Sequence, residues 1–187
     1  MLSTESQTQL LAVAKASLRY GLEHGRALAL DYQTYAPELQ QPLASFVTLE
    51  IAAQLRGCIG SLEARRPLVV DVAENAFAAG FRDRRFPPLK ATELAQLSVH
   101  ISLLSTPEEL VFMDEADLLQ QLRPQVDGLI LQAGAQRGTF LPAVWDSLPE
   151  PMQFLQQLKL KTGLARNYWS PELRAFRYTC QVIACEW

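Results

Sequence analysis

The apolar residues of the first part of the chain recur with the period of an α-helix. From residue 6 to residue 24 they lie three or four positions apart, so they would share one face of a helix. Ser6 is a suitable N-cap for this helix, and Gly25 can end it in a left-handed conformation. The same pattern predicts three further helices, one starting near Pro67 and two covering residues 114–122 and 151–161.

Elsewhere apolar and polar residues alternate, which is typical of β-strands. The alternation predicts a hairpin that begins at Phe46 and returns through residues 55–62, although its connection holds no strong turn dipeptide. Further strands are predicted over residues 98–105, 127–134, 138–142 and 175–186. Because hairpins are mixed with helices and do not follow a regular βαβ order, the sequence favours the α+β class.

The stretch LRGCIG, residues 55–60, conflicts with good strand design. Gly57 and Gly60 weaken a strand, and Arg56 is costly to bury without a partner. Side chains on a strand repeat with period two, so Arg56 and Cys58 are expected on one face, where a cation favours a thiolate. We therefore predict a functional surface with Cys58 as candidate nucleophile and with Arg56, Gly57 and Gly60 binding a ligand. A structural role stays open, with Cys58 as a small buried hydrophobe and Arg56 paired to an acid.

The segment FRDRRFPPLK, residues 81–90, is predicted to be an irregular loop fixed by its two prolines. Arg85 and Phe86 are candidate ligand-binding residues, because an irregular loop can deliver charged groups that a helix cannot. Asp83 is a candidate catalytic base, or a group that orients Arg56. The alternative is an internal Asp–Arg ion pair that shapes the loop, with Phe86 as a core side chain.

Composition narrows the class of protein. The 187 residues suit one domain, and 49% of them are hydrophobic, so a packed core is expected. The formal net charge of −3 argues against a general nucleic-acid binder. Three cysteines and two histidines show no zinc spacing, so no metal site and no cofactor are evident. No apolar run reaches the roughly 18 residues that span a membrane, and the first residues do not resemble a secretory signal, so a cytoplasmic protein is expected.

Several motifs occur here in one order, and together they resemble the AMMECR domain family, whose bacterial members are called AmmeMemoRadiSam system protein A. They are LRGCIGSLEARRPL, DVAENA, FRDRRFPPL, ISLLSTPEEL, DGLIL, GTFLPAVW and FLQQLKLKTGL. The resemblance runs from about Leu11 to Glu186. It implies one α+β domain over residues 1–187, with a mixed sheet and flanking helices. It also implies a larger and a smaller lobe and a cleft between them, lined by residues of the LRGCIG region.

The chain departs from the family pattern at two places. Arg84 stands where the family often has a proline, which leaves the entry into the loop less rigid. Lys159 stands where many members have a cysteine, so a mechanism that uses two thiols at these positions is not open to this chain.

The resemblance leaves the biochemical activity open and implies an association with a radical SAM protein and a Memo-like protein. We expect the cleft to bind a small anionic or nucleotide-like ligand, with this chain as a component of an enzyme system. The alternative is a non-catalytic adaptor or protein-binding module. Nucleic-acid binding through the local arginines is a weaker third reading.

Overall fold

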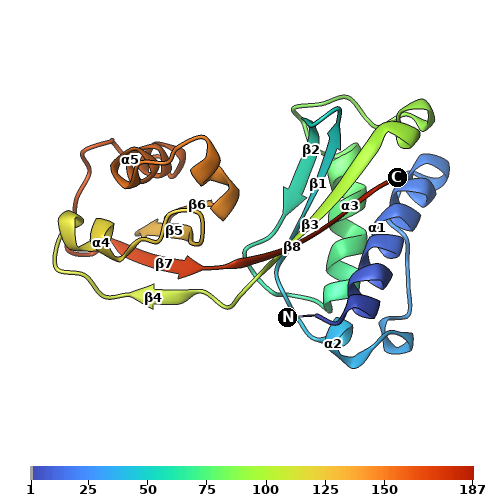
Figure 1. Ribbon diagram of the computed structural model, residues 1–187, viewed down its shortest axis with the longest axis horizontal. Coiled ribbons are helices and arrows are strands. Elements are labelled where there is room, and N and C mark those ends of the chain that lie inside the picture. Colours follow the sequence, from blue (N-terminus) through green and yellow to red (C-terminus); the bar gives the residue numbers. More distant parts are fainter. Residues whose placement is uncertain (1) are drawn as a thin grey trace. The chain divides into compact units, whose positions relative to one another are not determined.

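The computed structural model describes residues 2–187 and divides into two compact units. Unit 1 holds the chain up to Leu104 together with Gln181–Trp187, and unit 2 holds Ser105–Cys180. Figure 1 labels the helices and strands of both. Helices and two separate antiparallel sheets confirm the α+β class, although one mixed sheet was expected. Within residues 2–187, no helix is long and apolar enough to cross a membrane.

Unit 1 is a four-stranded sheet in the order β2-β1-β3-β8, accompanied by helices. Its elements are α1 (Thr4–His24), the 3-10 helix η1 (Tyr32–Thr34), α2 (Pro37–Gln40), β1 (Ser45–Ile51), β2 (Gln54–Gly60), α3 (Leu68–Phe81), the 3-10 helix η2 (Ala91–Gln96), β3 (Leu97–Leu104) and β8 (Cys180–Glu186).

The first helix begins earlier than expected. Ser3, and not Ser6, is the N-cap of α1, and its hydroxyl accepts a hydrogen bond from the Ser6 amide at 3.2 Å. Ser6 is 1% exposed and lies inside the helix. Gly25 ends α1 in the left-handed conformation that was predicted, with φ of 66°. Both serines suit the N-cap by residue type. The point at which the backbone enters the helix decides between them, and this point is Ser3.

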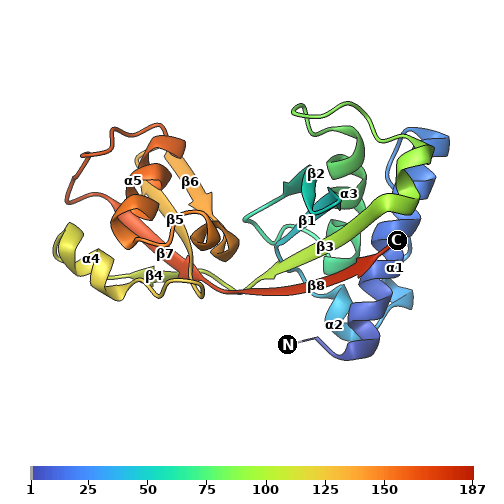
Figure 2. The ribbon, with the colours of Figure 1, turned by 45° about the horizontal axis from the view of Figure 1, so that its top comes forward.

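The core of unit 1 lies between the sheet and the helices α1 and α3, which run beside each other against it (Figures 1 and 2). Alternate residues of the central strands are fully buried in this core, among them Val47 and Leu49 of β1 and Val99 and Ile101 of β3. The period-two pattern of the sequence therefore identifies the buried face correctly.

The hairpin of β1 and β2 turns through Ala52 and Ala53, which have φ values of 52° and 60°. Two positive φ values are typical of a tight type I′ hairpin turn, which glycine and asparagine normally occupy. The pairing then shifts by one residue, because Glu50 faces Leu55 while Leu49 faces Gly57. Arg56 is thus the additional residue of a β-bulge, which bends and twists the strand locally.

Unit 2 contains the second sheet, in the order β4-β7-β5-β6. Its core includes Trp145 and Phe154, whose rings stack at 3.8 Å, and the Trp145 indole donates a hydrogen bond to the Asp127 carbonyl at 2.7 Å. Its elements are β4 (Glu108–Leu110), α4 (Glu115–Gln121), β5 (Gly128–Ala133), β6 (Gln136–Phe140), the 3-10 helix η3 (Pro142–Asp146), α5 (Pro151–Lys161) and β7 (Arg174–Tyr178).

The prediction of a single last strand over residues 175–186 is wrong. The segment forms two strands in different sheets, with β7 paired to β4 and β5 and with β8 next to β3. The break falls at Thr179, whose amide donates to the Ser105 hydroxyl at 3.0 Å and whose carbonyl accepts from the Ser105 amide at 2.9 Å. The sequence of this segment has the pattern of one strand. Its two parts differ only in the strands with which they pair.

Candidate functional site

Both glycines of LRGCIG are required by close packing within unit 1. A Cβ on Gly57 would overlap the backbone carbonyl oxygen of Ala79 in α3, and a Cβ on Gly60 would overlap the Phe46 ring and the Ser45 carbonyl. The sequence predicted a close approach to this backbone. The groups that approach Gly57 and Gly60 in the structure belong to a helix and a strand of the same chain.

Arg56 is 9% exposed and forms a clamp with the 3-10 helix η2. Its Nε donates to Glu93 Oε1 at 2.7 Å, and its Nη2 donates to Glu93 Oε2 at 3.1 Å and to the Pro87 carbonyl at 2.9 Å. These hydrogen bonds from Arg56 hold the pKa of Glu93 below its usual range. The contacts agree with the structural alternative, in which Arg56 pairs with an acid, and that acid is Glu93 and not Asp83.

The β-bulge also removes the basis for placing Arg56 and Cys58 on one face. Arg56 has no partner on β1. The alternation of side chains between the two faces of a strand is therefore interrupted between Arg56 and Cys58. Arg56 is directed to Glu93 and Pro87, whereas the Cys58 sulfur accepts a hydrogen bond from Thr48 Oγ1 at 3.2 Å. The cation that touches Cys58 is Arg85, whose Nη2 donates to the Cys58 carbonyl at 3.3 Å.

Asp83 is the buried centre of this part of unit 1, with 7% of its surface exposed. Its carboxylate accepts hydrogen bonds from the Cys58 amide at 2.9 Å and from Arg85 Nη2, Nε and N at 2.7, 3.0 and 3.1 Å. The Arg85 side chain, more than any other group, holds the pKa of Asp83 well below its usual range. A general base works best with a pKa near the operating pH, so these contacts suit a positioning role for Asp83.

Arg85 presents its guanidinium at the surface of unit 1, where its side chain is 57% exposed. Hydrogen bonds to Asp83 raise the pKa of Arg85, and Cys58 adds a smaller effect in the same direction. The Phe86 ring lies 5.5 Å below the guanidinium carbon and is half-buried, outside the main core clusters. The loop residues 83–86 therefore combine an ion pair that shapes the loop with a cation that remains accessible.

Cys58 is half-buried and lies in a row of polar residues across the sheet. Thr48 of β1 faces Cys58 on one side and His100 of β3 on the other, and His100 Nε2 lies 3.5 Å from Glu50 Oε2. Only the strand register brings His100 into one row with Cys58, so the spacing of the two residues in the sequence does not predict it. Directly paired residues lie about 5 Å apart, so Thr48 separates the two by about 10 Å between Cα atoms.

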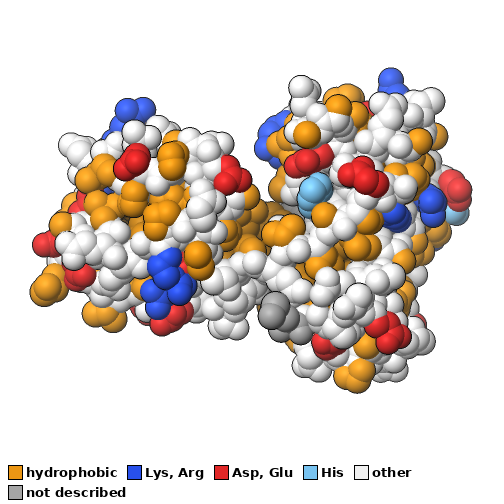
Figure 3. Space-filling model, in the orientation of Figure 1, with side chains coloured by type: hydrophobic (Ala, Val, Ile, Leu, Met, Phe, Trp, Pro, Cys, Tyr) orange, Lys and Arg blue, Asp and Glu red, His pale blue; other side chains and the backbone are white. Residues whose placement is uncertain are grey.

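The structure thus brings Cys58, Asp83 and Arg85 together and places Arg56, Gly57 and Gly60 in the packing around them. Among the described residues, no three His, Cys, Asp or Glu side chains gather in a way that could hold a metal ion. On the face seen in Figure 3, acidic and basic side chains are interspersed over both units, with no continuous basic area. The cleft that the family resemblance implies stays a prediction.

Comparisons with known proteins agree with the resemblance. The family model AMMECR1 matches residues 11–183. A protein from Methanothermobacter thermautotrophicus is 35% identical over 188 residues, which cover 97% of this chain and 95% of that protein. A protein from Thermofilum pendens is 32% identical over 198 residues and covers 97% and 91%, respectively. The crystal structure of the uncharacterized protein PH0010 from Pyrococcus horikoshii aligns with a TM-score of 0.91 and 27% identity over 100% of this chain and 94% of that one.

Proposed function

The chain belongs to the AMMECR1 family, and we propose that it binds a small anionic ligand at Arg85, directly beside Cys58. The relatives carry names that state no activity, so the proposal depends on the geometry of unit 1. The chain then acts as a component of an enzyme system, together with the Memo-like and radical SAM proteins that the resemblance implies.

One observation carries the proposal: a buried carboxylate fixes an exposed guanidinium. Asp83 has 5% of its side chain exposed, whereas Arg85 has 57%. Asp83 engages Nε and Nη2 of Arg85 on one edge of the guanidinium, so the Nη1 side remains directed away from this pair. A guanidinium held in this way loses little conformational entropy when it binds a phosphate or carboxylate.

Cys58 and Phe86 define what such a ligand would meet. The Cys58 sulfur already accepts a hydrogen bond from Thr48, and its backbone is tied to both Asp83 and Arg85. A ligand held by Arg85 therefore lies next to the backbone of Cys58, beside a candidate nucleophile. The Phe86 ring offers a stacking surface for a nucleotide base.

The test is protection of Cys58 from alkylation. The rate of iodoacetamide labelling at Cys58 is measured by peptide mass spectrometry with and without AMP, at constant ionic strength. We expect AMP to slow labelling severalfold in the unmodified chain and in Arg84→Gln, and to have no effect in Arg85→Gln. Arg84 is a matched control, because it is exposed and carries the same charge one position away. Equal labelling rates with and without AMP in the unmodified chain would refute the proposal.

A protein-binding module is the second candidate function, and one feature of unit 2 favours it. Val111 and Met113 are 87% and 90% exposed, immediately after β4, which is an edge strand. They line a groove of about 340 Å³ together with Phe112 and Trp169. Exposed apolar side chains beside a free strand edge are typical of a protein-binding surface.

Purified partners separate the two functions. Binding of the Memo-like and radical SAM proteins is measured directly by calorimetry, with Val111→Ser/Met113→Ser and Arg85→Gln as variants. The adaptor function predicts binding that only the double variant weakens. The adaptor function would be excluded if neither purified protein binds the chain.

A further inference from the structure

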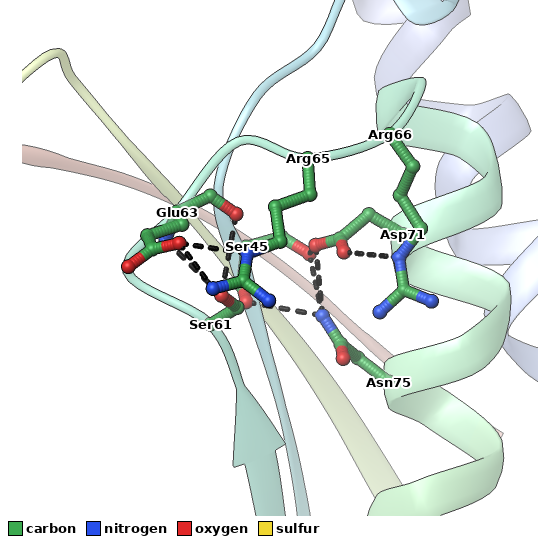
Figure 4. A network of polar contacts seen from close by, with 7 residues as sticks. All are labelled: Ser45, Ser61, Glu63, Arg65, Arg66, Asp71 and Asn75. Atoms are coloured by element: carbon green, nitrogen blue, oxygen red, sulfur yellow. Dashed lines mark hydrogen bonds and ion pairs between the residues drawn. The ribbon is translucent and has the colours of Figure 1, made fainter.

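A polar pocket lies at the start of α3, just after the LRGCIG strand. It has a volume of about 250 Å³ and is lined by Ser61, Glu63, Arg65, Arg66 and Asp71. One water occupies about 30 Å³ of the liquid, so the pocket can accept a group as large as a phosphate or pyrophosphate. Figure 4 shows both arginines approaching it from the loop that leads into α3. None of these residues belongs to the Arg85 site.

The inner wall of the pocket is held in place by the buried Asp71 carboxylate, both oxygens of which accept hydrogen bonds. Asp71 is 2% exposed, and its Oδ2 accepts hydrogen bonds from Ser45 Oγ at 2.6 Å and from Asn75 Nδ2 at 2.8 Å. Its Oδ1 accepts from Arg66 Nε at 2.8 Å. The buried network therefore holds the Arg66 guanidinium by one nitrogen, and its two Nη groups donate to no acceptor in the described part of the chain.

The outer wall holds a second guanidinium with a weak internal partner. Arg65 Nε donates to Glu63 Oε2 at 2.7 Å, and these side chains are 76% and 46% exposed. An ion pair this exposed contributes little and opens easily. Glu63 thus presents to Arg65 the same kind of group, a carboxylate, that an anionic ligand would present.

The helix itself adds to the preference for an anion. α3 has 14 residues, and its N-cap, Pro67, makes no side-chain hydrogen bond to the first turn, where the Leu68 amide donates to the Gln41 carbonyl at 3.0 Å. The N-terminus of a helix carries a partial positive charge and binds phosphate groups in many proteins. Two adjacent guanidinium groups and this helix end all favour the same ligand chemistry.

We propose that Arg65 and Arg66 form a second anion site at the start of α3, which binds a phosphate-bearing small molecule and in which Glu63 competes with that ligand for Arg65. Arg66 is the fixed group and Arg65 the group that exchanges its partner. The site is independent of the function proposed at Arg85.

The probe is pyrophosphate, added to the ¹⁵N-labelled full-length chain at constant ionic strength. The Nε–H signals of Arg65 and Arg66 and the amide signals of Ser61 and Glu63 are followed by NMR. We expect saturable shifts of these signals. Arg65→Gln and Arg66→Gln should each weaken the affinity about tenfold, because each removes charge-assisted hydrogen bonds. Glu63→Gln should tighten binding about threefold, because it removes the competing carboxylate.

The variants also separate this site from alternatives. Arg66→Gln deprives the buried Asp71 of a partner and can unfold unit 1, but Arg65→Gln alters only exposed groups, so the proposal stays testable. Arg84→Gln controls for a general loss of charge. The proposal is overturned if the shifts do not saturate, if Glu63→Gln weakens binding, or if only Arg85→Gln abolishes it, since the anion would then bind at the first site.

Discussion

Asp83 Oδ2 accepts a hydrogen bond from the backbone N–H of Cys58 at 2.9 Å. The contact joins the LRGCIG strand to the loop after α3, across 25 positions of the sequence. The same carboxylate carries the Arg85 guanidinium, so one buried side chain sets the position of the candidate nucleophile and of the candidate anion-binding group. The geometry at Cys58 therefore depends on the ionisation of Asp83.

Asp83→Asn should destabilise the chain by about 1 to 3 kcal/mol at pH 7, because a buried amide cannot accept all four hydrogen bonds that the carboxylate takes from Arg85 and from the Cys58 amide. The effect should depend on pH. The pKa of Asp83 in the folded chain lies below the value of about 4 in the unfolded chain. Its stabilisation is therefore complete above pH ~4 and is lost as the pH falls toward the lower, folded-state pKa.

Thermal unfolding measured between pH 7 and pH 2 checks this dependence. The difference in stability between the unmodified chain and Asp83→Asn should shrink at the acid end. Asp146→Asn, at an exposed aspartate in η3, serves as the control and should change little at any pH. A gap that stays constant down to pH 2 would contradict the prediction.

Gly57→Ala should be strongly destabilising, because its Cβ would overlap the backbone carbonyl oxygen of Ala79 and neither backbone can move freely. We expect a loss of about 3 kcal/mol or more in the free energy of unfolding. Gly80→Ala is the matched comparison. Its Cβ would come closest to the terminal Cδ2 of Leu18, at 2.9 Å, and would lie in ordinary contact with Leu89 at 3.6 Å, and the change gains helix propensity of about 1 kcal/mol. Urea unfolding should give a near-neutral Gly80→Ala, and similar losses for both variants would refute the packing explanation.

The local pattern predicts much of the fold because burial follows periodicity. Val47 and Leu49 lie at the period-two positions of β1 and are fully buried, and Gly25 ends α1 as expected. The hydrophobic pattern does not predict structure where the choice of pairing strand determines it. Residues 175–186 look uniform, yet β7 and β8 join different sheets, and nothing within that segment records its partners.

The sequence predicts the residue types of the candidate site and, as one alternative, the Asp83–Arg85 ion pair within the loop, but not the partner of Arg56. Asp83, Arg85 and Cys58 do meet, but Arg56 pairs with Glu93 and not with Asp83. The period-two argument assumed a regular strand, and the bulge at Arg56 invalidates it. The bulge, the row from Cys58 to His100, and the contact of Gly57 with α3 all depend on long-range register, which residue spacing alone does not encode.

Ala53→Gly should stabilise unit 1. Ala52 and Ala53 both adopt positive φ in the β1–β2 turn, a conformation that costs about 1 kcal/mol or more for an alanine and is free of this strain for glycine. Both residues are exposed, so the change removes no packing. Thermal unfolding should show a gain of up to about 1 kcal/mol, reduced by the higher entropy of glycine in the unfolded chain. Ala64→Gly, at an exposed loop alanine without positive φ, should not stabilise.

Cys180 should react slowly with alkylating reagents in the folded chain. Burial raises the pKa of its thiol to about 12, so the thiolate fraction at pH 8 falls about a thousandfold below that of an ordinary exposed cysteine. Labelling at pH 8 with iodoacetamide, followed by peptide mass spectrometry, should leave Cys180 unmodified until the chain is denatured. Rapid labelling of Cys180 in the folded chain would show that partial burial does not suppress its thiolate.

Lys159 and Glu115 should respond unequally to substitution. The Lys159 side chain is fully buried in unit 2, and its Nζ donates to Glu115 Oε2 at 2.5 Å, whereas Glu115 is 29% exposed. Removing the acid in Glu115→Gln leaves a buried ammonium without its counter-charge, which should cost about 3 kcal/mol or more.

Lys159→Met keeps much of the side-chain volume and leaves behind only a carboxylate that water can reach, so its cost should be far smaller. Urea unfolding of the two single variants and of the double variant measures this asymmetry. In the double variant, Lys159→Met should rescue most of the loss caused by Glu115→Gln, because the charge that made the loss large is gone. Equal losses in the two single variants, adding up in the double variant, would mean that the pair contributes through packing and not through a buried charge that must be neutralised.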